Sequence, residues 1–130
     1  MRWRLQINTL LSQAAVALGL LFVISGSFHT VSVISDAVKE RASYDFRMVS
    51  LLTTGGITIY PGLINIIISR WIKQGQLWAF GMSAVVTFPQ MIFLAFLGPL
   101  HPNFLIGVIL NGLYLGLLFV AWKSARKENF

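Results

Sequence analysis

Long apolar runs alternate with short polar intervals along the chain, and the longest run sets the fold. Gln74–Trp122 contains 49 consecutive residues without an Asp, Glu, Lys or Arg. As one helix this run would be about 74 Å long, more than twice the roughly 30 Å hydrocarbon thickness of a bilayer. The segment GPLHPN at 98–103 combines a glycine with two prolines, which end helices. The run therefore predicts a transmembrane hairpin.

Two more apolar runs precede this hairpin. We expect four spans at about 6–29, 47–69, 77–98 and 103–122, forming one transmembrane domain over 1–130. Short loops between helices that each carry a stripe of small and polar residues favour an all-α, integral membrane, antiparallel four-helix bundle. Between the first two spans, apolar residues recur at helical spacing opposite polar ones, which predicts a short amphipathic helix on the membrane surface. Its apolar positions are Val31, Ile34, Val38 and Ala42.

Composition supports the membrane class. The 130 residues are 56% hydrophobic and only 11% charged, too few to cover a soluble domain of this size. The net charge of +6 arises from clusters between the apolar runs rather than from one basic face, so we expect no nucleic-acid partner. No cysteine is present, which excludes thiol chemistry and thiolate-bound metals.

The basic residues predict the orientation. Seven of ten precede the first span, join the second and third, or follow the fourth. Because Lys and Arg concentrate in cytoplasmic loops, we expect both termini in the cytoplasm of a cell with a plasma (inner) membrane of bacterial type. The four tryptophans fall at the same boundary, where indole rings favour the membrane interface.

Uncharged polar residues recur within the spans at two depths. Thr54, Gln90 and Asn111 share a level near the outer face, and Gln13, Asn65 and Ser83 share one near the inner face. An amide without a partner in hydrocarbon costs several kcal/mol, so we expect these groups to point inward. They either join helices by hydrogen bonds or line a small-molecule pocket. The candidate ligand-binding residues are Thr54, Gln90, Asn111 and Tyr114.

The fourth span also carries Gly112 and Gly116, four residues apart on one face. Such a pair allows another backbone to approach closely. Packing within the chain and contact with an outside partner both remain open. Gly112 and Gly116 are the candidate partner interface.

Catalytic chemistry has few candidates. The spans contain no ionisable residue at depth, which argues against proton-coupled transport. We expect no metal site, because His29 and His101 are the only histidines and two imidazoles alone bind a metal poorly. An enzyme site would be confined to the outer surface, where Asp36, Glu40 and Asp45 lie, so the chain leans away from catalysis.

These features predict a non-catalytic subunit or assembly partner in a membrane complex, in contact with lipids and with a membrane protein or its own copy. The alternative is a protein that binds a neutral or lipid-like molecule, such as a quinone, inside the bundle. No cofactor is required; a bound lipid or quinone would be the ligand.

Overall fold

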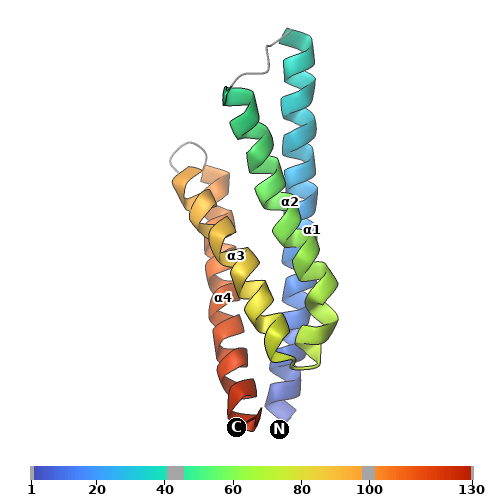
Figure 1. Cartoon of the computed structure of the whole chain (residues 1–130), viewed down its shortest axis with the longest axis vertical. Helices are drawn as coiled ribbons and strands as arrows, with labels where there is room; N and C mark the ends of the chain where they lie inside the picture. Colours follow the sequence, from blue (N-terminus) through green and yellow to red (C-terminus); the bar gives the residue numbers. More distant parts are fainter. Residues whose placement is uncertain (1, 41–45, 98–101, 130) are drawn as a thin grey trace.

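The computed structural model describes residues 2–40, 46–97 and 102–129, and it is all-helical. Its helices are α1 (Arg2–Glu40), α2 (Phe46–Lys73), α3 (Leu77–Leu97) and α4 (Pro102–Asn129) (Figure 1). Each of these four helices is long and apolar enough to cross a membrane. The all-α prediction is confirmed. Residues 98–101, the main part of the predicted GPLHPN turn, lie outside the described chain.

The predicted surface helix is not a separate element. The stretch around Val31, Ile34 and Val38 belongs to α1, which continues without a break for 39 residues. No glycine or proline follows Gly26 within α1, so nothing in the sequence ends the helix there. Thr30 instead donates a hydrogen bond to the Gly26 carbonyl, 2.8 Å away within the same helix. At 1.5 Å per residue α1 is about 58 Å long, and together with the start of α2 it extends past the ends of α3 and α4 (Figure 1).

The helices form a ring. Close contacts join α1 to α2, α2 to α3, α3 to α4 and α4 to α1, and across the described residues none joins a diagonal pair. Both chain ends lie at the same end of the molecule (Figure 1).

Glycines bring α1 and α2 into backbone contact. A methyl group added at Gly19 would lie 2.6 Å from the Gly62 carbonyl oxygen, and one at Gly26 would lie 3.0 Å from that of Gly55. Residue numbers therefore rise along α1 as they fall along α2. This contact was not predicted from the sequence, although Gly19 and Gly26 on α1 and Gly55 and Gly62 on α2 are each spaced by seven residues, two helical turns.

A glycine also shapes the turn between α2 and α3. Gly75 has a φ of 75°, a left-handed conformation that glycine adopts without steric cost. Its N–H donates to the Ile72 carbonyl (3.0 Å) and that of Gln76 to the Trp71 carbonyl (3.0 Å), the pattern of a Schellman cap. Gly75 thus supplies the reversal of the chain between α2 and α3.

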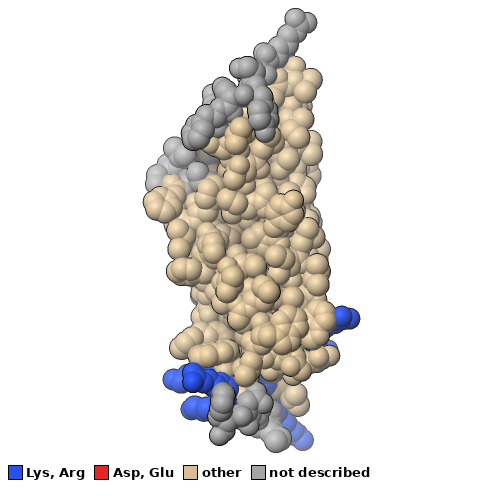
Figure 2. Space-filling model, in the orientation of Figure 1, with Lys and Arg blue, Asp and Glu red and all other residues tan. Residues whose placement is uncertain are grey.

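The apolar core lies toward the end that carries the termini. Leu11, Ile72 and Phe80 are almost completely buried there, beside Tyr114 and Leu118. On the face shown in Figure 2, the Lys and Arg side chains gather at this same end.

Tryptophan rings accompany the basic residues. Trp71 and Trp78 lie with their centroids 5.3 Å apart, and the Arg70 guanidinium sits 3.9 Å from the Trp71 ring centroid. Stacked cationic and aromatic groups of this kind are typical of a membrane–water boundary.

Candidate functional site

An inner layer of hydrogen-bonded polar side chains joins α2, α3 and α4. The Ser83 hydroxyl lies 2.6 Å from Asn65 Oδ1 and 2.6 Å from the Tyr114 hydroxyl. The Asn65 amide nitrogen donates to Thr87 Oγ1 at 3.0 Å. All four residues are buried. The predicted meeting of Asn65 and Ser83 is confirmed.

The donor directions in this layer follow from its chemistry. A serine hydroxyl has one proton, and Asn65 Oδ1 can only accept, so Ser83 donates to Asn65. The Tyr114 hydroxyl must then donate to Ser83. Every link has a donor and an acceptor, which is how polar groups are stabilised in a bundle interior. This layer links three helices through side-chain hydrogen bonds.

A second polar layer lies farther from the basic end. Asn111 of α4 donates to Gln90 Oε1 of α3 at 3.4 Å, and Gln90 donates to the Thr58 carbonyl of α2 at 3.3 Å. Gln90 and Asn111 are each 1% exposed, so both amides face the interior as expected. Thr54 is buried on the same helix as Thr58 and donates to the Ser50 carbonyl of its own helix (2.9 Å).

One polar residue does not lie in the layer that its position in the sequence predicted. Gln13 is exposed, so its assignment to the inner polar layer is wrong. On α1, Leu11, Ser12 and Ala15 face the bundle interior instead, and Gln13 is turned about 100° from Ser12. Tyr114, one of the candidate ligand-binding residues, is buried, and its hydroxyl bonds to Ser83 of the inner layer.

A cavity of about 310 Å³ lies among the four helices next to the outer polar layer. Its polar lining comes from Ser25 and His29 of α1 and from Thr54 and Thr58 of α2. Its remaining lining is mostly apolar and includes Phe22, Leu94 and Phe104. Gln90 and Asn111, two candidate ligand-binding residues, bond to each other rather than line this space.

His29 is part of the α1–α2 contact. Its Nε2 lies 3.0 Å from the Leu51 carbonyl oxygen, which can only accept, so Nε2 carries the proton. His101 lies outside the described residues. Over the part of the chain that the structure describes, no three His, Asp or Glu side chains are grouped as a metal site would need.

The glycine pair of α4 faces outward. Gly112 and Gly116 line an apolar groove of about 630 Å³ between α3 and α4, together with Gly81, Ala84 and Phe119. A methyl added at Gly116 would meet no atom within 4 Å, and one at Gly112 would meet only Met91 Sδ, at 3.9 Å. Among the described glycines, close contact of one glycine backbone with another is seen between α1 and α2.

No protein-family model, curated protein or solved structure matches this chain. The class of protein is therefore defined by its own features: an all-helical chain with four helices that could each span a membrane.

Proposed function

We propose that this protein is a non-catalytic subunit of a membrane complex, inserted as an antiparallel bundle with both termini in the cytoplasm. One observation carries the proposal: the Gly112–Gly116 face is an open groove with almost no contact inside the chain. Within a bilayer, helices associate by close packing at small residues, since lipid supplies no hydrophobic force between them. A groove floored by Gly81, Gly112 and Gly116 has the shape that receives a transmembrane helix.

The occupant that fits this groove is a helix of a partner membrane protein or of a second copy. The polar side chains of the two interior layers are hydrogen-bonded, and none of them is an Asp, Glu, Lys, Arg or His, so these layers give no support to a proton-coupled transporter. The open groove is therefore the surface at which we expect the partner to bind.

Replacing Gly112 and Gly116 together with Ile would fill the groove and should abolish the assembly that the native protein forms on a native gel after mild detergent extraction. Gly56→Ile is the control. It adds one isoleucine side chain on α2, where an added methyl would touch only the Tyr60 ring at 3.8 Å. Assembly that survives the double variant, or is lost equally in the control, would contradict the proposal. Mass spectrometry of the isolated band distinguishes a partner protein from a second copy.

A second candidate function rests on the 310 Å³ cavity beside Thr54 and Thr58. Its size lies near the lower limit of the roughly 300–1,000 Å³ typical of ligand pockets, and its mixed lining suits a neutral or lipid-like ring such as a quinone head group. Mass spectrometry of the organic fraction released from purified protein tests this function. A stoichiometric small molecule lost in Thr58→Phe supports it, and bulk lipid alone contradicts it.

A further inference from the structure

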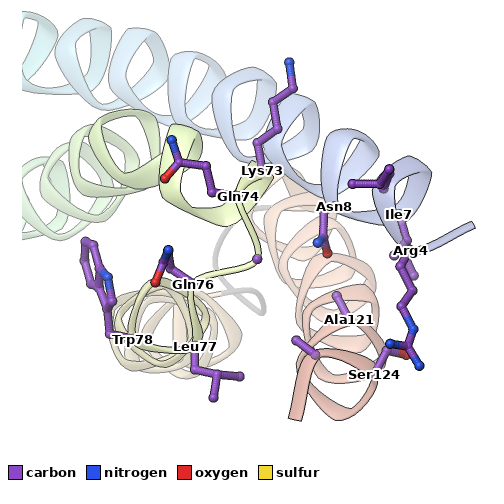
Figure 3. A pocket seen from close by; sticks show the side chains of 13 residues that line it. Arg4, Ile7, Asn8, Lys73, Gln74, Gln76, Leu77, Trp78, Ala121 and Ser124 are labelled. Atoms are coloured by element: carbon purple, nitrogen blue, oxygen red, sulfur yellow. The ribbon is translucent and has the colours of Figure 1, made fainter. Parts of the chain in front are cut away.

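A cavity of about 660 Å³ opens at the basic end of the bundle. It shares no lining residue with the Gly112–Gly116 groove or with the 310 Å³ cavity. It lies between the start of α1, the turn that joins α2 to α3, and the end of α4 (Figure 3). Seven of its lining side chains can donate hydrogen bonds: Arg4, Asn8, Lys73, Gln74, Gln76, Trp78 and Ser124. Among the lining residues that the structure describes, none is an Asp or Glu. The cavity is therefore electropositive.

The side chains take different positions around this space. In Figure 3 the Asn8 amide and the Gln76 amide approach it from opposite sides, and Arg4 extends along α4 toward Ser124. The Lys73 side chain leads outward from the rim, where its flexible stem allows the ammonium group to swing toward a bound anion.

The backbone adds to the positive potential. Gln76 accepts the first hydrogen bonds of α3, from the N–H groups of Ala79 (3.1 Å) and Phe80 (3.5 Å). The N–H groups of Leu77 and Trp78 precede these bonds at the positive end of the helix dipole, and both residues line the cavity. No acidic residue occupies the first turn of α3 to offset that charge.

We infer that this cavity binds a phosphate group. An arginine, a lysine and several amide and hydroxyl donors make the donor set that suits phosphate oxygens. Leu5, Leu77 and Trp78 supply apolar walls beside these donors, which fits the glycerol and upper acyl region of an anionic phospholipid. Basic pockets between transmembrane helices on the cytoplasmic side hold such head groups. Free phosphate shares the same chemistry.

Native mass spectrometry of the full chain in mild detergent tests this inference, with phosphatidylglycerol and phosphatidylcholine of identical acyl chains as the two probes. We expect phosphatidylglycerol to bind at least about tenfold more tightly, as charge-assisted contacts imply. Arg4→Gln with Lys73→Gln should remove this preference. The matched control is Arg2→Gln with Lys127→Gln, which removes the same charge from exposed residues at the same end of the bundle that do not line the cavity.

A second variant guards against a folding defect. Ser124→Phe keeps every charge but fills the cavity, and it should also abolish the preference while circular dichroism stays that of the native protein. Calorimetry with inorganic phosphate separates the two sources. Phosphate that binds alone and is lost in the Arg4 and Lys73 variant identifies free phosphate, whereas lipid binding without it identifies a head group. An unchanged preference in both cavity variants, or an equal loss in the control, overturns the inference.

Discussion

At the scale of single residues, the glycines have different structural roles, which depend on what surrounds each of them. Gly75 supplies a left-handed backbone, Gly19 and Gly62 allow helix contact, and Gly116 faces open space. In the sequence these glycines lie in apolar runs or in a short polar interval, and these settings alone do not separate the three roles. Their substitution should therefore have sharply different effects on stability.

Replacing Gly75 with Ala should destabilise the fold by about 1–2 kcal/mol, because an L-residue at positive φ is strained. The added methyl would also lie 3.2 Å from Asn8 Nδ2. Gly81→Ala is the control, since its methyl would meet nothing within 4 Å and alanine favours the helix. Unfolding in detergent micelles measures both. Equal stability of the two variants would show that the turn does not need glycine.

The buried hydroxyls make a second residue-scale prediction. Ser83→Ala and Tyr114→Phe should each cost about 0.6–2 kcal/mol, the range for hydrogen bonds between membrane helices. Because the two side chains share one bond, the double variant should cost less than the two single losses combined. Tyr60→Phe, at a side chain that is 68% exposed, should have little effect. Additive losses at Ser83 and Tyr114 would contradict the shared bond.

At the scale of helices, α1 and α2 form the tightest pair because four glycines lie between them. Gly62→Ala should destabilise the bundle by about 1–3 kcal/mol, the usual cost of overpacking, since its methyl would lie 2.7 Å from the Gly19 carbonyl oxygen. Gly56→Ala on the same helix should be nearly neutral. The same unfolding assay compares them, and a Gly62→Ala variant as stable as Gly56→Ala would rule out the close backbone contact.

Helix number and approximate bounds were predictable from apolar runs and prolines, and Pro102 begins α4 as its fixed φ favours. The continuation of α1 past His29 was missed, because polar residues were taken to mark a membrane boundary although they do not end a helix. Burial of Gln90 and Asn111 followed from the cost of leaving amides in hydrocarbon. The polar cavity at the basic end was not predictable, since it joins residues from three distant parts of the chain.

At the scale of the whole molecule, charge and packing point the same way. Except for Lys39 in the last turn of α1, the Lys and Arg residues whose side chains the structure describes lie with the tryptophan pair at the end that carries the termini, where the buried apolar cluster also lies. Hydrophobic side chains are exposed along the length of all four helices. We propose that a bilayer covers this surface, with the basic end at the cytoplasmic face.

The most direct test of this account is the topology in intact bacterial cells. The chain has no cysteine, so single cysteines can be introduced at Ser32, near the outer end of α1, and at Gln74, in the turn between α2 and α3; both positions are exposed. An impermeant thiol reagent should label the cysteine at Ser32 in intact cells and the cysteine at Gln74 only after the cells are broken. Labelling of both positions from outside would contradict the proposed membrane bundle, and labelling of Gln74 alone would contradict its proposed orientation.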